Sequence, residues 1–193
     1  MFDKITKYYQ LSPIYDGKGK NKVLEKYFMN NFNDLSIPCV VTTYNIQDYE
    51  PMIFCSWKHG YRTSKILGAT TSPPTIYPPV KINEKYYCDG GVAINNPTSI
   101  AYNIANEKFT DFRILSIGTG KYKPKWNNNV PDWGGIQWIM NGLIDLMANA
   151  PNQIVEKNMN EKMGNKLLRL DNDNIGNIYF DEYNEKNLKL LKT

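Results

Sequence analysis

Short apolar runs bounded by turn-forming residues recur along this chain. Each run is rich in β-branched or aromatic residues and is flanked by Pro, Gly, Asn or Asp, a pattern typical of buried strands. The polar segment 47–50 is short enough for a tight turn, so the first two strands should pair with each other. The predicted strands span 38–46, 51–57, 84–90, 112–120 and 165–171.

Between these runs, apolar residues recur at the spacing of an amphipathic helix. Gly17 to Lys20 is interpreted as a turn, because two glycines alternate with two lysines there. Residues 148–151, which end in Pro151, should interrupt the longest helix. The predicted helices span 23–32, 61–69, 97–109, 133–163 and 184–192.

Strands that alternate with helices predict an α/β fold. The length of 193 residues suits one domain with a sizeable core. No internal repeat or clear linker divides the sequence, so we expect a single domain over 1–193. Its α/β core should span 38–124, and a helical region with the last strand should span 131–193.

The composition is that of an ordinary globular protein, with 41% hydrophobic and 22% charged residues. The net charge of +4 comes from lysines spread along the chain, apart from the group Lys121, Lys123 and Lys125. This charge fits an anionic surface as a partner and argues against sequence-specific binding of nucleic acid. No apolar stretch is long enough to span a membrane, and the first ten residues lack the apolar core of a signal peptide. We therefore expect a cytoplasmic protein or one that is peripheral at membranes.

The chain has few residues that bind metals or activate nucleophiles. Its cysteines, Cys39, Cys55 and Cys88, lie in strand-like runs without metal-ligand spacing, and we expect buried thiols in a reducing compartment. The one histidine, His59, lies in a segment without motif character and is expected at the surface or in a turn. A phosphate loop is excluded at "SIGTGK", because the residue after Lys121 is neither Ser nor Thr and the glycine spacing is wrong. We expect neither a metal nor a cofactor.

The stretch "YYCDGGVAINNP" places the carboxylate of Asp89 at the end of a predicted strand, followed by Gly90 and Gly91. Taken alone, Asp-Gly-Gly is typical of a turn. Its context resembles the Asp-Gly-Gly/Ala segment of the patatin-like lipid acyl hydrolases, which also continues into Asn-Asn-Pro. Upstream, "ILGATTSPPTIYPPV" is similar to the family's segment before the aspartate, and "RILSIGTG" matches its later strand and glycine turn. The resemblance also includes "SPIYDGKGKNKVLEKYF", "PCVVTTYNIQDYEPMIF" and "LLRLDND", and so covers nearly the whole chain.

The resemblance implies a patatin-like three-layer sandwich of α/β class that is incomplete at its N-terminal side, since the family's nucleophile helix has no counterpart here. It also implies ester hydrolysis by a Ser-Asp dyad, in which the aspartate takes the serine proton directly and the serine attacks a lipid ester. By this match Asp89 is the catalytic base, and Gly90 and Gly91 complete its motif. The carboxylate should face a cleft at the carboxyl end of its strand. The implied partner is a lipid or membrane-surface ester.

The family's nucleophile is missing from the sequence. The family serine lies in Gly-x-Ser-x-Gly, whereas Ser116 has Gly118 after it but Ile114 before it. Cys88 does not replace the serine, since Tyr86 stands two residues before it. The chain therefore has the base of a dyad without its nucleophile.

Two interpretations stay open. In the first, the chain is the C-terminal portion of a patatin-like phospholipase or lipase, as a fragment, as one product of a split gene whose other half lies upstream, or through a misplaced start codon. In the second, the chain is a non-catalytic descendant that acts as a lipid-surface or protein-binding module. Trp126, Trp133 and Trp138 suit contact with a membrane interface, although tryptophans in an amphipathic helix are more often simply packed.

Overall fold

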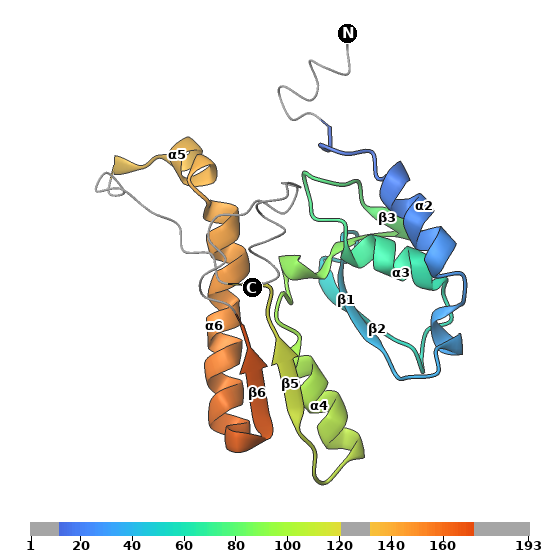
Figure 1. The fold of residues 1–193 in the computed structure, drawn as a ribbon. Helices are drawn as coiled ribbons and strands as arrows, with labels where there is room; N and C mark the ends of the chain where they lie inside the picture. Colours follow the sequence, from blue (N-terminus) through green and yellow to red (C-terminus); the bar gives the residue numbers. More distant parts are fainter. Residues whose placement is uncertain (1–11, 121–131, 172–193) are drawn as a thin grey trace, which may run out of the picture. The chain divides into compact units, whose positions relative to one another are not determined.

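The computed structural model describes residues 12–120 and 132–171 (Figure 1). The chain divides into two compact units, Met1–Pro97 and Thr98–Thr193, and each is described by itself. The single domain expected over 1–193 stays a prediction.

A four-stranded antiparallel sheet forms the first unit, with the strand order β2-β1-β4-β3 (Figure 1). β1 is central, because it pairs with β2 along its whole length and with β4 from Thr43 to Asn45. The first three predicted strands and the turn between the first two are therefore confirmed. The strands are β1 (Val40–Asn45), β2 (Glu50–Cys55), β3 (Val80–Ile82) and β4 (Lys85–Asp89).

β3 is a short strand that the hydrophobic pattern did not predict. It follows two prolines and has 3 residues, too few for an alternating pattern to stand out. The turn Asn83-Glu84 joins it to β4, and these residues have φ values of 46° and 68°. Two positive φ angles in a two-residue loop are typical of a type I′ hairpin, which usually has Asn-Gly. Because glutamate replaces glycine at the second position, the sequence lacks the usual signal for this hairpin.

Helix α3 lies against the sheet, and α2 packs on α3 (Figure 1). α3 confirms the helix predicted at 61–69, but α2 begins five residues earlier than predicted, so the interpretation of Gly17 to Lys20 as a turn was wrong. Gly17, with φ 74°, is the N-cap, and the helix continues through Gly19 despite the low helix propensity of glycine. Packing on α3 outweighs that propensity. The helical elements are α2 (Lys18–Tyr27), α3 (Thr63–Thr70) and the 3₁₀ turns η1 (Phe32–Asp34) and η2 (Gly90–Val92).

The core of the first unit lies between α3 and the sheet. Around it, the ring of His59 packs edge-on against Phe54 and stacks on Tyr61, while His59 Nδ1 accepts the N–H of Cys55 at 3.0 Å. His59 was expected at the surface or in a turn, and it lies half-buried directly after the turn at 56–58, where its role is structural. Cys55 and Cys88 are buried thiols as predicted, whereas Cys39 is half-buried. The buried core residues are Phe32, Phe54, Ile66, Ala69, Ile82 and Tyr87.

The second unit contains a parallel strand pair, β5 and β6, in register from Ile114↔Leu167 to Ile117↔Leu170. α4 packs on β5, and α6 packs on β6. The last two predicted strands and the helix predicted at 97–109 are confirmed. The elements are α4 (Thr98–Lys108), β5 (Ile114–Ile117), α5 (Gly135–Met140), α6 (Leu143–Met163), the 3₁₀ turn η4 (Gly164–Lys166) and β6 (Leu167–Leu170).

The long helical region of this unit breaks at a glycine and not at its proline. Gly142, with φ 99°, separates α5 from α6, whereas Pro151 lies inside α6. The interruption predicted at 148–151 was therefore wrong. A left-handed residue ends a helix outright, while an internal proline removes one backbone hydrogen bond that a packed helix tolerates. The helix predicted at 184–192 and Trp126 lie outside the described residues.

Polar side chains connect the end of β6 to the glycine turn after β5. Arg169 donates to Ser116 Oγ at 2.8 Å and to Asp171 Oδ2 at 2.7 Å, and Asp171 Oδ1 accepts the N–H of Gly120 at 3.0 Å. A Cβ at Gly118 would stand 2.3 Å from the Asp171 carboxylate, so a larger residue would displace that carboxylate from Arg169. The motifs "RILSIGTG" and "LLRLD" thus form one structural feature.

The mixture of packed helices and strands confirms the predicted α/β class. Over the ranges 12–120 and 132–171, no helix combines the length and the apolar character needed to cross a membrane.

Candidate functional site

Asp89 is the last residue of β4 and pairs with Thr43 of β1. It lies at the carboxyl end of its strand, as expected, but the sheet around it is antiparallel. The rule for parallel sheets therefore does not explain its place. Instead, Asp89 is the N-cap of the 3₁₀ turn η2, so the Asp-Gly-Gly stretch is a strand end and a turn at once.

Only one oxygen of the half-buried Asp89 carboxylate accepts a hydrogen bond within the described residues. Its Oδ1 accepts the N–H of Gly91 at 2.7 Å, and its own backbone N–H donates to Ser72 O at 3.0 Å. Within the described residues, Oδ2 makes no hydrogen bond, and no hydroxyl or thiol donates to either oxygen. One oxygen is thus fixed and the other is available to a further donor.

Glycine is suited to each of the two positions after Asp89 for a different structural reason. A Cβ at Gly90 would stand 2.4 Å from Thr42 O and 2.5 Å from Thr42 Oγ1, so glycine is needed for η2 to approach β1. A Cβ at Gly91 would stand 3.0 Å from Asp89 Oδ1, the atom that accepts the Gly91 N–H. The motif therefore lets the backbone come close to both the carboxylate and the neighbouring strand.

Burial raises the pKa of the Asp89 carboxyl above its usual range. The hydrogen bond from Gly91 and the positive charge of Lys20 act in the opposite direction but are smaller. A carboxylate with a raised pKa is a stronger proton acceptor than one in solvent, which suits a general base.

Lys20 was not singled out from the sequence, and it is the charged side chain that acts on Asp89. Its Nζ donates to Gly68 O at 3.0 Å, to Thr71 O at 2.7 Å and to Ser72 Oγ at 2.8 Å. Burial lowers the pKa of Lys20, while the charge of Asp89 raises it. In the sequence this lysine lies in "GKGK". Because that stretch was interpreted as a turn, the sequence did not indicate that Lys20 faces α3.

The candidate nucleophiles close to Asp89 in sequence or space are unsuited to the role. Burial, and then the charge of Asp89, raises the pKa of the Cys88 thiol, which keeps it protonated. Ser72 is buried, donates to Gly68 O at 2.7 Å and accepts from Lys20. Neither Cys88 nor Ser72 is therefore suited to act as the nucleophile for Asp89.

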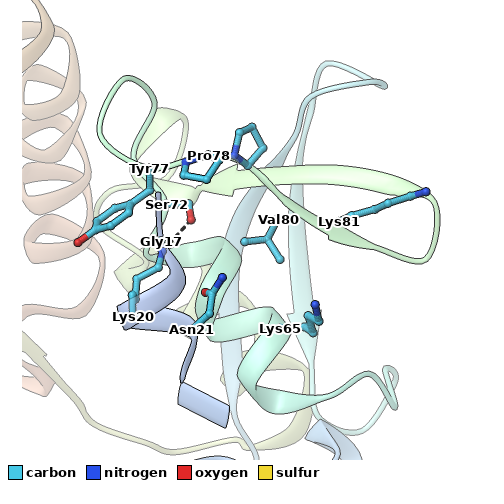
Figure 2. Close-up of a pocket in the computed structure, with 10 residues that line it drawn as sticks. Gly17, Lys20, Asn21, Lys65, Ser72, Tyr77, Pro78, Val80 and Lys81 are labelled. Carbon is cyan, nitrogen blue, oxygen red and sulfur yellow. Dashed lines mark hydrogen bonds between the residues drawn. The ribbon is translucent and has the colours of Figure 1, made fainter. Parts of the chain in front are cut away.

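A pocket of about 210 Å³ opens beside α3 in the same unit (Figure 2). Lys20 and Ser72, joined by their hydrogen bond, lie on its wall together with Asn21, Tyr77 and Val80 (Figure 2). Asp89 does not line this pocket, so the cleft expected in front of its carboxylate stays a prediction. As far as the chain is described, no group of three or more His, Cys, Asp or Glu side chains is placed to hold a metal ion.

Comparison with known protein families decides what kind of chain this is. The model of the patatin-like phospholipase family matches residues 2–102, just over half of the chain, and this span includes Asp89, Gly90 and Gly91. The chain belongs to the patatin-like phospholipase family. The resemblance inferred from the motifs and the α/β patatin-like fold class are therefore confirmed.

Curated patatin-like proteins are similar over most of this chain. Patatin-like protein 2 of Oryza sativa subsp. indica is 27% identical over an alignment of 187 positions, which covers 75% of this chain and 45% of that protein. Patatin-like protein 2 of Arabidopsis thaliana is 26% identical over an alignment of 182 positions, which covers 75% of this chain and 45% of that protein. Patatin-like protein 3 of Arabidopsis thaliana is 24% identical over an alignment of 230 positions, which covers 93% of this chain and 52% of that protein. The chain spans about half the length of the curated relatives it matches.

Asp89→Asn is expected to stabilise this patatin-like chain at neutral pH. Because the pKa of Asp89 is raised, the folded state binds its proton more tightly than the unfolded state, and the ionised carboxylate lowers the free energy of unfolding above that pKa. Asparagine keeps an acceptor for the Gly91 N–H and removes the charge. The melting temperature should rise at pH 7, and the gain should shrink as the pH falls through the pKa of Asp89. Calorimetry resolves the change, since about 1 kcal/mol moves the melting temperature by about 2–4 °C in a chain of this size.

Asp48→Asn is the matched control for this measurement. The hydrogen bond from Lys85 lowers the pKa of the exposed Asp48 carboxyl, so the ionised Asp48 favours the folded state. Loss of the Asp48 charge should therefore lower the melting temperature at pH 7. A lower melting temperature for Asp89→Asn than for the wild type at pH 7 would show that burial is not the dominant influence on the pKa of Asp89.

Proposed function

We propose that this chain contributes the general base of a Ser-Asp dyad to a lipid acyl hydrolase, and that Asp89 is this base. The observation that carries the proposal is the state of the carboxylate. Asp89 ends β4, is half-buried, has Oδ1 fixed by the Gly91 N–H, and has Oδ2 without a hydrogen bond in the described residues. Membership of the patatin-like phospholipase family supports the reaction class.

In the proposed reaction, Asp89 accepts the proton of a serine hydroxyl as the serine oxygen attacks the carbonyl carbon of an ester. The tetrahedral intermediate collapses, the alkoxide leaves as the alcohol with that proton, and an acyl-serine remains. Water then attacks the acyl-serine while Asp89 accepts the water proton. When the second intermediate collapses, Asp89 returns that proton to the serine oxygen, and the fatty acid is released. Asp89 thus acts as the base in both halves.

The serine in this proposal lies outside these 193 residues, because no Gly-x-Ser-x-Gly occurs in them. A segment that carries this motif, in the same polypeptide or in a separate N-terminal half, is the proposed protein partner. The proposed substrate is a lipid ester at a membrane surface, and neither nucleic acid nor a cofactor has a role.

The test compares the chain alone with the chain plus its missing partner. The full 193-residue chain is assayed with a short-chain nitrophenyl ester, alone and after co-expression with the polypeptide encoded directly upstream of Met1. We expect no turnover above background for the chain alone, since a carboxylate without a positioned nucleophile and oxyanion donors lacks the main sources of rate. Turnover should appear with an upstream segment that carries Gly-x-Ser-x-Gly, and should disappear when that serine is replaced by alanine.

Two outcomes would contradict the proposal. Turnover by the chain alone would show that another nucleophile exists, and an upstream segment without the motif would favour the non-catalytic lipid-surface or protein-binding module. The described part of the chain offers that module limited support, because Trp133 and Trp138 pack edge to face on each other, with their ring centroids 5.3 Å apart.

A further inference from the structure

The ammonium group of Lys20 is held in one place. A lysine ammonium has three donors, and each of them is used, on Gly68 O, Thr71 O and Ser72 Oγ. The ring of Tyr77 adds a cation–π contact at 4.3 Å from the ring centroid. Figure 2 shows Lys20 directed at Ser72. The positive charge therefore cannot swing toward another partner without losing all of these contacts.

The acceptors of Lys20 connect it to the backbone of Asp89. Gly68 O and Thr71 O belong to the last turn and the C-cap of α3, where carbonyl groups lack helical N–H partners and a positive charge is favourable. Ser72 follows directly, and its carbonyl accepts the backbone N–H of Asp89 at 3.0 Å. One side chain from α2 thus fixes the segment that supports the end of β4.

The charge of Lys20 also reaches the carboxylate of Asp89, although the two groups form no salt bridge within 4.0 Å in the described residues. The neutral partners of Asp89 are Thr43, its strand partner in β1, the Ser72 carbonyl and the Gly91 N–H. The Cys88 thiol also feels the charge of Asp89, and Asn95 Oδ1 lies 3.3 Å from the position of a Cβ at Gly91, which is 3.0 Å from Asp89 Oδ1. Lys20 is thus the source of positive charge at Asp89, and it leaves Oδ2 available.

We propose that Lys20 is a positioning residue for Asp89, which anchors Ser72, whose carbonyl accepts the Asp89 N–H, and holds a fixed positive charge that acts on the carboxylate without pairing with it. This inference rests on the proposed function, in which Asp89 is the base. A fixed cation nearby keeps a half-buried carboxylate ionised and ready to accept a proton, whereas a direct ion pair would occupy the oxygens that the serine needs.

The test reads the titration of Asp89 by carbon-13 NMR of its carboxyl group in the full 193-residue chain. Lys20→Gln keeps amide donors for the carbonyls of α3 and removes the charge, Lys20→Arg keeps the charge, and Lys18→Gln is the matched control. Lys18 lies on the same helix, is exposed and contacts Asp16 at 3.5 Å. We expect the pKa of Asp89 to rise in Lys20→Gln and to stay near the wild-type value in Lys20→Arg and Lys18→Gln. The amide of Asp89 should exchange its hydrogen faster in Lys20→Gln.

An unchanged pKa of Asp89 in Lys20→Gln would overturn the proposal, because a residue that only caps α3 would not move this titration. If Lys20→Gln does not fold, the reciprocal measurement decides. The coupling of two charges is the same in both directions, so the pKa of Lys20, read by nitrogen-15 NMR, should be lower in Asp89→Asn than in the wild type. Equal values would overturn the proposal.

Both titrations are independent of turnover. Hydrolysis that persists in Asp89→Asn would refute the proposed function and leave the coupling between Lys20 and Asp89 intact. Absence of the coupling would refute the positioning role and leave the proposed function standing.

Discussion

Asp89→Asn is expected to lower ester hydrolysis about 10²- to 10⁴-fold in the protein assembled with its Gly-x-Ser-x-Gly segment, the range for loss of a positioned general base. Asparagine retains the hydrogen bond from the Gly91 N–H and has no ionisable oxygen, so the loss should fall on kcat with little change of KM. Because the base must be ionised, the wild-type rate should decline as the pH falls through the raised pKa of Asp89. The pH profile of kcat is the measurement.

Asp48→Asn again serves as the control, since it removes a carboxylate from the turn between β1 and β2 and should leave kcat unchanged. Together with the calorimetry, the two variants separate catalysis from stability, because Asp89→Asn should be less active and more stable at once. Full activity in Asp89→Asn would exclude Asp89 as the base.

Gly90→Ala is expected to destabilise the chain by about 3 kcal/mol or more, at the upper end of the cost of overpacking a protein interior. The new Cβ would stand 2.4 Å from the carbonyl oxygen of Thr42, a backbone atom of the central strand β1 that cannot rotate away. Relief would require η2 or β1 to shift, which would also move Asp89. Against a total stability of about 5–15 kcal/mol for a typical domain, such a loss is large. Denaturant unfolding of the full chain measures it.

Gly19→Ala is the matched control for Gly90→Ala. Gly19 lies within α2, and a Cβ there would have no heavy atom within 4 Å. Alanine favours the helix over glycine by about 0.5–1 kcal/mol, so this variant should be slightly more stable than the wild type. Equal stability of Gly90→Ala and the wild type would show that η2 has room for a side chain, and the close approach to β1 would then not explain the glycine.

Elements with a strong local pattern could be predicted from the sequence. The run "PCVVTTYNI" and its neighbour form the β1–β2 pair because their apolar and β-branched residues lie on either side of a short polar turn. α4 and β5 were found for the same reason. β3 was missed, since three residues after two prolines have no recognisable period, and the Asn83-Glu84 hairpin lacks the usual glycine.

The errors in the helices have physical reasons of their own. α2 begins at Lys18 because packing on α3 and the contacts of Lys20 outweigh the poor helix propensity of "GKGK". α6 continues through Pro151 because a packed helix tolerates the loss of one hydrogen bond, while the left-handed Gly142 sets the real boundary.

The sequence by itself determined the family of this protein, the identity of Asp89 as the candidate base and the lack of a Gly-x-Ser-x-Gly motif, because each of these depends on residues that are adjacent in the chain. Tertiary structure alone decided which residues surround Asp89. Lys20 meets its acceptors 48 to 52 positions further along the chain, and Gly90 of η2 meets Thr42 of β1, although three strands and a helix lie between them in the sequence. Such contacts depend on the path of the whole chain, and no local pattern of apolar and polar residues records them.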